Sequence, residues 1–489
     1  MIVKNKIEEF QSYLEDTSNL KGTASILYLP QEQGEIAPLL QQCAEKHIPF
    51  TVSAGRTGTA GGCVPTDGAV ISLENLKKII DINVKDCTVH VQSGVSFEEL
   101  EKETRKYGLT LRASPTEGLA HIAGAVSTAA SGVRGFGYGS IRGYVQEIEL
   151  VLTSGSVLCI KRADIYARDG YFDFLYKGKH FTFKLPGYSM PRVKSQAGYF
   201  VNDAMDLIDL FIGSEGTLGI ITSCRLRLQK LPERIFDGLI FFDKEEEAFQ
   251  FVNLVKKLKD EKLLVPASLE FFDRHALSFL RPDYSFIPQS EAAIYFEQEV
   301  ERGEDFDSLL DRWAVLIGKS GALSEASILA DTPLERARVF SFRHRLPQAI
   351  NEFLRAHKQV KTATDIAVPW EHFSEMYSFY KEKGLESGLD YVNFGHIGES
   401  HLHFNFLPKD DIQGVKARTY LQLFCKKAVS LGGTVSAEHG IGKIKKPYLN
   451  IMYTDHQLIE MARVKKYFDP SWLLGLDTIF SKDILGKQP

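Results

Sequence analysis

The chain has 489 residues, 44% hydrophobic and 25% charged, with a formal net charge of −5. At roughly 150 residues per domain this length predicts two or three domains, and the charge argues against nucleic acid as a partner. No run approaches the ~18 apolar residues of a membrane span, so we expect a cytoplasmic protein and leave peripheral membrane attachment open. The six cysteines form no CxxC pair, which excludes zinc-ribbon and cysteine-ligated iron–sulfur centres.

The N-terminal 48 residues are predicted to form a helix, a strand over Ala24–Leu29 and a helix over Ile36–Lys46. A short strand, Pro49–Val52, then enters the loop SAGRTGTAGG. Small residues in such a loop allow close backbone approach, and its N–H groups can bind an anion. No GK[ST] follows, so it is not a P-loop, and its glycine spacing differs from the Rossmann fingerprint. A flexible turn is the alternative interpretation.

Two further segments rich in small residues follow this loop. They are HIAGAVSTAASG (121–132), which continues through more glycines to Gly139, and GSEGTLGIIT (213–222). Strands are predicted at Val70–Leu73 and Val89–Val91, and a helix at Phe97–Tyr107. Three glycine-rich stretches, each next to a strand, favour a long cofactor lying across the backbone of one domain.

After Leu231 the pattern changes to strands alternating with amphipathic helices. This alternation predicts an antiparallel sheet with helices on one face. A long helix, Pro333–His357, carries Arg343 and Arg345, whose guanidinium groups suit a planar carboxylate. The alternative is that both arginines are solvated helix charges. The predicted strands are Ile235–Phe242, Ala267–Phe272 and Glu291–Glu297, and the helices between them are Lys244–Leu258 and Phe306–Ile317.

The stretch YVNFGHIGESHLH (391–403), together with SAEHG (436–440), has the composition of a metal site. His401 and His403 share one face of an extended segment, and His396 can approach across the glycine turn. Histidine nitrogens and a carboxylate suit zinc, with manganese, cobalt or iron as alternatives. The predicted ligands are His396, His403 and Glu438, and His401 is left open as an alternative ligand. His439 is the candidate base.

Taken in order, these segments resemble the vanillyl-alcohol-oxidase/p-cresol-methylhydroxylase flavoprotein superfamily. AGRTGTAGGCVP, AGAVSTAASG with YGSIR, and GSEGTLGIIT resemble its FAD-contacting segments, and HIGESHLH and SAEHGIG resemble its D-lactate/glycolate/2-hydroxyglutarate dehydrogenase branch. The resemblance implies an α+β fold: a two-subdomain FAD-binding domain of the p-cresol-methylhydroxylase type (1–230, with an insertion at about 163–193) and an antiparallel-sheet cap domain with helices on one face (231–430). Residues 431–489 should return to the FAD domain, as a helix over Met461–Phe468 and a strand.

The resemblance also implies the FAD contacts. The first loop should wrap the pyrophosphate, which accepts N–H donors where no Cβ intervenes. That loop has no histidine, so FAD should be non-covalent, with attachment through His121 left open. The predicted contacts are Gly55, Arg56, Thr57, Gly58, Thr59, Pro115, Gly124, Ser127, Thr128, Ser131, Gly213, Ser214, Glu215, Gly216, Ile220 and Ile221.

Three departures from the family pattern stand out. Ala363 occupies the position of a lysine in 2-hydroxyglutarate-type enzymes, and Lys361 is the candidate substitute. The family's asparagine–proline–glycine–lysine element corresponds here to GLDT (475–478). The aromatic and basic insertion at about 171–190 is either an ordered surface element or a docking surface for a redox partner or subunit.

We therefore predict an FAD-dependent dehydrogenase of a D-2-hydroxy acid such as D-lactate, glycolate or a 2-hydroxyglutarate-like acid. A metal would lower the pKa of the substrate hydroxyl, His439 would take its proton, and Arg343, or as second choice Arg345, would orient the carboxylate. Hydride would pass to flavin N5. The electron acceptor (a quinone, a cytochrome or an electron-transfer protein) and a homodimer stay open. The alternatives are a flavin oxidase of a sugar alcohol or aldonolactone, and a non-catalytic FAD-binding subunit of a redox complex.

Overall fold

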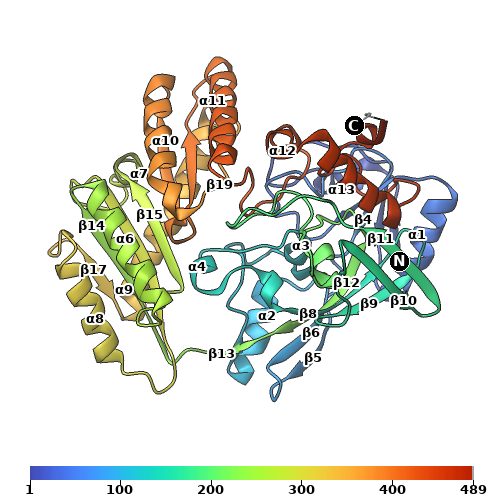
Figure 1. Cartoon of the computed structure of the whole chain (residues 1–489), viewed down its shortest axis with the longest axis horizontal. Coiled ribbons are helices and arrows are strands. Elements are labelled where there is room, and N and C mark those ends of the chain that lie inside the picture. The colour runs from blue at the N-terminus through green and yellow to red at the C-terminus, as the bar shows by residue number, and fades with distance from the viewer. Residues whose placement is uncertain (487–489) are drawn as a thin grey trace.

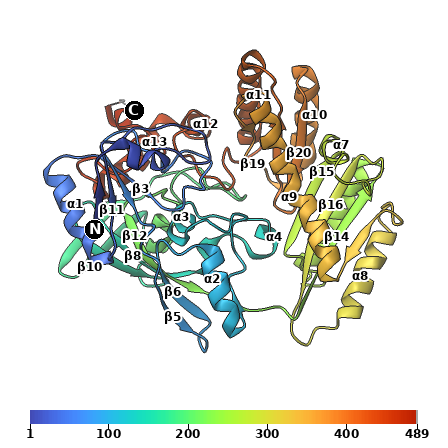
Figure 2. The same ribbon diagram turned by 180° about the vertical axis from the view of Figure 1, so that it is seen from behind.

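A computed structural model describes residues 1–486, which form two lobes side by side (Figures 1 and 2). The first lobe contains residues 1–230 and residues 431–486. The second lobe contains residues 231–430. The chain crosses to the second lobe after β13 (Gln229–Lys230) and returns after α11 (Asp411–Ser430). No helix among the described residues has the length and apolar character needed to cross a membrane.

The first sheet of the first lobe has the strand order β1-β2-β4-β3. Strands β2, β4 and β3 run parallel to one another, and α1 (Ile36–Glu45) carries the chain back between β2 and β3. The helix predicted at the extreme N-terminus is wrong: residues 2–4 instead pair antiparallel with β2, and short 3₁₀ turns follow. The strands are β1 (Ile2–Lys4), β2 (Ile26–Leu29), β3 (Phe50–Ser53) and β4 (Ala69–Ser72).

The second sheet of this lobe is antiparallel, in the order β5-β6-β12-β8-β9. Helix α2 begins with a reciprocal capping box between Ser96 and Glu99, and α3 packs on β12. A small ribbon joins β13 to β7 (Leu109–Thr110). The strands are β5 (Ile79–Asn83), β6 (Thr88–Gln92), β8 (Val145–Val151), β9 (Val157–Lys161) and β12 (Ile220–Arg227). The helices are α2 (Phe97–Thr104), α3 (Ile122–Ser127), α4 (Gly135–Tyr138) and α5 (Leu207–Phe211).

The insertion is an ordered hairpin, β10 (Tyr171–Tyr176) with β11 (Lys179–Lys184). Phe183 packs against Tyr467 and Phe468 of α13 (Asp455–Phe468), which follows α12 (Lys446–Met452). The docking role stays a prediction. The predicted C-terminal return strand is reduced to one parallel bridge between Phe50 and Leu474, which nevertheless ties the C-terminal segment to the first sheet.

The second lobe is built on an antiparallel sheet in the order β17-β14-β16-β15-β20-β21-β18, with β19 pairing β21. Its strands are β14 (Arg234–Phe242), β15 (Ser268–Asp273), β16 (Ala292–Val300), β17 (Ile328–Ala330), β18 (Thr362–Ala363), β19 (Ile366–Ala367), β20 (Tyr391–Gly395) and β21 (His401–Phe406). The helices are α6 (Glu245–Asp260), α7 (Arg274–Leu280), α8 (Phe306–Gly318), α9 (Pro333–Ala356), α10 (Phe373–Ser387) and α11.

The α+β class is confirmed, but the expectation of helices on one face of this sheet is wrong. Phe236, Ile240 and Phe242 of β14 join a core with α6 and α8, whereas Leu239 and Phe241 join another core with α7 and α9. Figures 1 and 2 show α6 before one face and α9 before the other. The reason is visible in the sequence: a continuous apolar run such as LIFF needs cover on both sides.

Candidate active site

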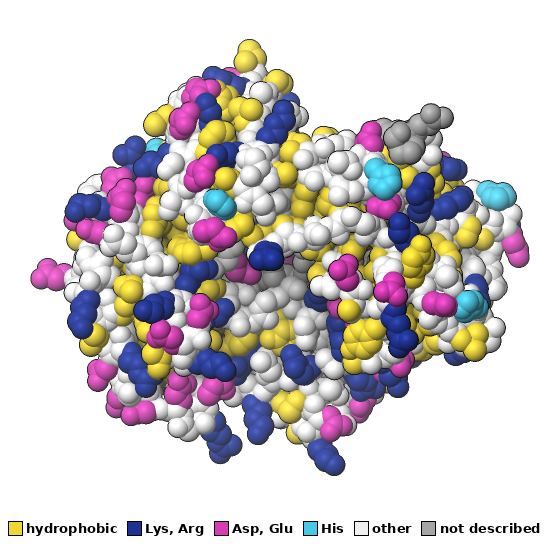
Figure 3. Space-filling view, viewed as in Figure 1, with side chains coloured by type: hydrophobic (Ala, Val, Ile, Leu, Met, Phe, Trp, Pro, Cys, Tyr) yellow, Lys and Arg dark blue, Asp and Glu magenta, His cyan; other side chains and the backbone are white. Residues whose placement is uncertain are grey.

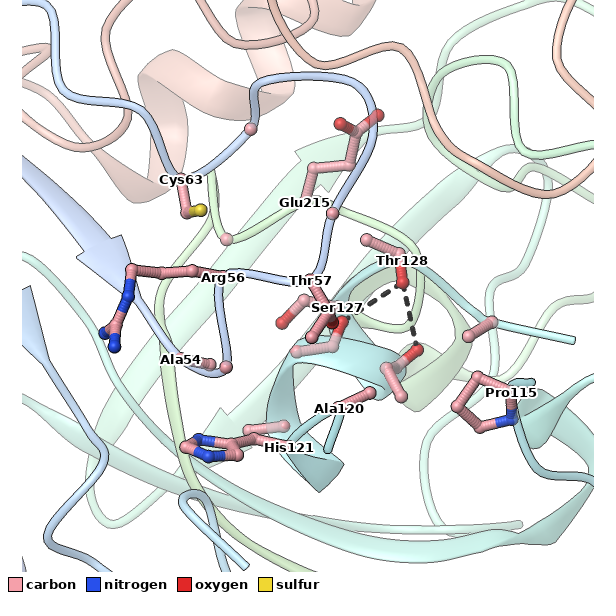
Figure 4. A pocket seen from close by; sticks show the side chains of 18 of the residues that line it. Ala54, Arg56, Thr57, Cys63, Pro115, Ala120, His121, Ser127, Thr128 and Glu215 are labelled. Carbon is pink, nitrogen blue, oxygen red and sulfur yellow. Dashed lines mark hydrogen bonds between the residues drawn. The ribbon is translucent and has the colours of Figure 1, made fainter. Parts of the chain in front are cut away.

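The small-residue segments of the first lobe surround a cavity of about 320 Å³. Among the predicted FAD contacts only Gly213 and Ser214 lie outside its lining, within the described part of the chain. These two instead shape the turn behind it, since Gly213 N–H donates to Val126 O and the Ser214 hydroxyl to Phe211 O. Figure 4 shows Ser127 and Thr128 in the cavity, with Pro115 beside them and the first loop above.

Backbone, not side chains, forms much of this cavity wall. Arg56 has a left-handed φ of 56°, and its side chain points away from Ser127 and Thr128 (Figure 4). The Arg56 guanidinium is occupied by Glu74, 3.0 Å away. Gly216 has φ of 67°, and a Cβ there would project into open space. Left-handed residues at a cavity wall place N–H groups toward a ligand without a side chain in the way.

Polar groups in the wall also lack partners. Ser131 Oγ and His121 Nδ1 are buried and make no hydrogen bond to any described residue. Buried polar atoms are normally paired, so these two mark a cavity made for a polar ligand. A dinucleotide flavin, with ribose hydroxyls, a pyrophosphate and ring carbonyls, fits both the exposed backbone and the unpaired side chains.

A histidine–carboxylate cluster lies at the end of the same cavity. One ligand atom from each of His396, His401, His403 and Glu438 lies within 4.8 Å of the others. Glu438 Oε1 is 3.5 Å from His396 Nε2 and 3.3 Å from His403 Nε2. Donors around one zinc ion at ~2.1 Å lie about 3.4 Å apart in a tetrahedron. The predicted ligands His396, His403 and Glu438 are therefore brought together at metal-site spacing.

Each histidine is held by an oxygen on its far side. His396 Nδ1 lies 2.6 Å from Glu270 Oε1, and His403 Nδ1 lies 3.1 Å from Thr364 O. His401 Nε2 lies 3.0 Å from Asp365 Oδ1. Oxygen partners of this kind orient metal-binding imidazoles and raise their basicity. Glu270 and Asp365 were not predicted from the sequence as members of the site.

Arg343 reaches the cluster through Glu270. Its Nε and Nη2 donate to the two Glu270 oxygens at 2.9 and 3.3 Å, and both side chains are buried. The Nε–Nη2 edge of the guanidinium is therefore not free to donate two hydrogen bonds to a substrate carboxylate, as the sequence predicted. Nη1 remains available to donate. Arg345 is not brought to the cluster, because Asp283 and Glu352 hold it at 2.6 and 2.9 Å.

Lys194 is a further unpredicted member of the site. Its ammonium donates to Glu438 Oε2 at 2.8 Å and to Glu399 Oε2 at 3.0 Å. Burial opposes ionisation of Glu438, but Lys194 and His396 outweigh it and hold its pKa well below the usual range. Glu438 is thus kept as an anion, the form that binds a metal. The position that differs from the family, Ala363, pairs with Asn405 of β21, and the candidate substitute Lys361 is exposed.

The histidines differ in charge when no metal is present. Burial alone would lower the pKa of His396, but Glu270 and Glu438 outweigh it and raise the value to about 9. Burial lowers the pKa of His403 and lowers that of His401 to about 3. The cluster therefore holds a proton on His396 and free nitrogen lone pairs on His401 and His403.

The loop that carries Glu438 and His439 joins the two lobes. Asp365 Oδ1 accepts the N–H of Glu438 and Asp365 Oδ2 that of His439, at 3.2 and 3.1 Å. His439 Nδ1 lies 3.4 Å from Asp365 Oδ2, and its side chain is 34% exposed. Glu438 and His439 both line the cofactor cavity. In the view of Figure 1, the surface of the molecule is hollowed between the two lobes (Figure 3).

This fold and site define an FAD-linked oxidoreductase. Residues 231–475 match the family model for the C-terminal domain of FAD linked oxidases, and residues 24–161 match the FAD binding domain. The chain belongs to this family of FAD-linked oxidases, within the vanillyl-alcohol-oxidase/p-cresol-methylhydroxylase superfamily.

Curated relatives cover nearly the whole chain at modest identity. Glycolate oxidase subunit GlcD of Bacillus subtilis is 28% identical, over 93% of this chain and 88% of its own. D-lactate dehydrogenase of Anaerostipes hadrus is 27% identical, over 97% and 93%. D-2-hydroxyglutarate dehydrogenase of Xanthomonas citri pv. viticola is 26% identical, over 92% and 88%. Among solved structures, an alkyldihydroxyacetonephosphate synthase superposes with a TM-score of 0.69 at 16% identity, over 97% of this chain and 81% of that one, which shows the shared fold.

Proposed function

We propose that this protein oxidises a D-2-hydroxy acid to the 2-oxo acid, using FAD and a divalent metal, zinc first, held by His396, His403 and Glu438. The observation that carries the proposal is that Glu438, a member of the histidine cluster, lines the flavin cavity together with His439. His439 Nε2 lies 3.4 Å from Glu438 Oε1. When bound, FAD supplies a two-electron acceptor and the metal a Lewis acid that lowers the pKa of a hydroxyl.

His439 is proposed as the base. Asp365 is ionised, since Lys445 and His439 outweigh its burial and hold its pKa well below the usual range. Its Oδ2 lies near His439 Nδ1 and keeps a proton there, which leaves Nε2 to accept the substrate hydroxyl proton. The same carboxylate stabilises the imidazolium that forms. His439 is also the most exposed member of the cluster, so it can face a substrate.

Arg343 is proposed to contact the substrate carboxylate through Nη1 alone, because Glu270 occupies Nε and Nη2. Its position is thereby fixed by a buried carboxylate that also orients His396. Ala363 provides no charge for a second substrate carboxylate. The names of the relatives point to glycolate, D-lactate and D-2-hydroxyglutarate as the acids to compare, with an external electron acceptor of unidentified kind.

The test is anaerobic bleaching of the flavin by a panel of D- and L-2-hydroxy acids, before and after treatment with EDTA. We expect D-acids to reduce the flavin, chelation to abolish reduction, and one divalent metal to restore it. Full reduction after verified metal removal would contradict the metal-assisted reaction and favour an oxidase of a sugar alcohol or aldonolactone. No reduction by any acid, with FAD and metal both bound, would favour a non-catalytic subunit.

A further inference from the structure

His401 is buried beside the proposed metal ligands without an assigned role. It lies on β21 two residues before His403, so both side chains point to the same side of the strand. The pairing of Ala367 in β19 with His401 fixes its backbone, and its side chain is fully buried. The ring centroids of His401 and His403 are 4.6 Å apart. The buried His401 imidazole therefore lies beside the same site as the proposed ligand His403.

The two nitrogens of His401 have different surroundings. Nε2 lies 3.0 Å from Asp365 Oδ1, close enough for the carboxylate to attract a proton there, although the two groups are not aligned as a hydrogen bond. Nδ1 lies 4.0 Å from Glu438 Oε2, on the cluster side, and makes no hydrogen bond to any described residue. The carboxylate of Asp365 places the proton on Nε2, so Nδ1 presents a lone pair toward another anion. Glu438 Oε2 already accepts from the Lys194 ammonium at 2.8 Å, so the lone pair of Nδ1 gains no partner from that oxygen. One ligand atom of His401 lies within 4.8 Å of those of His396, His403 and Glu438, and a cation held by these residues would supply the missing partner.

The arrangement repeats that of the proposed ligands. His396 and His403 each turn one nitrogen to an oxygen, Glu270 or Thr364, and the other to Glu438. His401 does the same with the nitrogens exchanged. A histidine with a purely structural role is not expected to direct an unpaired lone pair at the Glu438 carboxylate.

We propose that His401 is a fourth protein ligand of the same metal, through Nδ1, giving a set of three imidazoles and one carboxylate. This inference rests on the proposed function for the existence of the metal. With four protein ligands, a tetrahedral ion has no open position. Substrate must then enter as a fifth or sixth ligand, which zinc, manganese, cobalt and iron all allow.

The test is X-ray absorption at the zinc edge of the zinc-loaded holoenzyme, which counts imidazole scatterers, with zinc affinity measured by chelator competition. We expect three imidazoles in the wild type and two in His401→Gln, with zinc affinity reduced by at least about 100-fold, beyond the ~10–100-fold loss caused by removing an outer partner of a ligand. In His401→Asn the amide oxygen can take the place of Nδ1, so a smaller loss is expected. His275→Asn, on α7 of the same lobe, is the control.

The outcomes separate this inference from the proposed function. Two imidazoles in the wild type, with affinity unchanged in His401→Gln, would overturn the His401 assignment and leave the metal site standing. A holoenzyme that binds no zinc or other divalent metal would overturn both. His439 Nε2 also lies 3.4 Å from Glu438 Oε1, so the imidazole count of His439→Gln identifies the third scatterer even where His401→Gln fails to fold. Three imidazoles retained in His439→Gln would support His401, and a fall to two would overturn the His401 assignment.

Discussion

Glu215 accepts a hydrogen bond from the backbone N–H of Ile441, with 2.8 Å between nitrogen and oxygen. Its second oxygen accepts the N–H of Gly442 at 2.7 Å. A Cβ on Gly440 would meet this carboxylate at 2.9 Å, so only glycine allows the close approach. One carboxylate thus joins the third glycine-rich segment, at the flavin cavity, to the loop that carries His439.

Replacing Glu215 should therefore impair catalysis without removing the flavin. In Glu215→Ala two N–H donors lose their partner, at ~1–3 kcal/mol each, and His439 loses its fixed position. We expect a lower urea midpoint and flavin reduction slowed by about 100-fold, as displacements of ~1 Å at a reacting group cause. Stopped-flow flavin reduction and urea unfolding measure these effects. The control is Glu117→Ala, which borders the same cavity but, within residues 1–486, accepts only from Leu119 N–H, at 2.9 Å. Wild-type behaviour in Glu215→Ala would refute the link.

His439→Gln tests the base. Loss of a general base slows a reaction by ~10²–10⁴-fold, so single-turnover flavin reduction should fall by this factor while zinc content stays at the wild-type value. Zinc is retained because His396, His403 and Glu438 remain. His456→Gln, which alters an exposed histidine of α13, should leave both measurements unchanged. Reduction by His439→Gln at the wild-type rate would assign the base elsewhere.

The stability of the metal-free protein should depend on pH through His396. Its pKa of about 9 in the folded protein exceeds the ~6.5 of an unfolded histidine. Its stabilising contribution is therefore fully present below about pH 6.5 and is lost as the pH rises through about 9. We expect the urea midpoint in EDTA to decline over this range, and to decline less in His396→Gln. Zinc should flatten the profile, because a coordinated nitrogen carries no proton. An equal decline in wild type and His396→Gln would contradict the assignment.

Arg343 and Arg345 form a matched pair for urea unfolding. Arg343→Ala leaves Glu270 buried without its main partner, and breaking a buried pair from one side costs ~3–5 kcal/mol. Arg345→Ala breaks contacts with partly exposed Asp283 and Glu352, where ion pairs contribute ~0–1 kcal/mol. We expect a large loss of stability only in Arg343→Ala, and Arg343→Lys to keep more stability but bind substrate more weakly. Equal effects of the two alanine variants would be inconsistent with this geometry.

The approach of His396 and His403 could be predicted because it is local. They flank a short turn between β20 and β21, where Phe394 pairs with His403, and sequence spacing carries that information. Glu438 comes from a distant segment, and it was predicted as a ligand from the composition of SAEHG (436–440), because no spacing argument connects the two stretches. The antiparallel sheet of the second lobe followed from the alternation of strands and helices, and the α+β class from the family resemblance. The N-terminal strand was not predicted, since it forms only by pairing with the edge of β2.

Long-range partners were beyond the sequence. Lys194 and Glu438 are separated by 244 residues, and nothing in either segment indicates the other. Glu270 did leave a signal: it is a charged residue in the middle of β15, SLEFFD, a strand that is buried at every position and whose other charged residue, Asp273, stands at its end. The sequence did not distinguish Arg343 from Arg345. Residues two apart on a helix point in different directions, so only one of the two arginines can face the interior, and the sequence did not show which.

The loop from Ser436 to Gly442 has a consequence for how the molecule can move and be divided. The N–H groups of its residues 438 and 439 donate to Asp365 of the second lobe. The N–H groups of its residues 441 and 442 donate to Glu215 of the first lobe. The lobes cannot swing apart as rigid bodies without breaking one of these carboxylate–amide pairs. Substrate must therefore enter by smaller side-chain or loop movements. A flavin-binding fragment ending near residue 230 would lack the loop with Glu438 and His439, which forms part of the wall of its cavity.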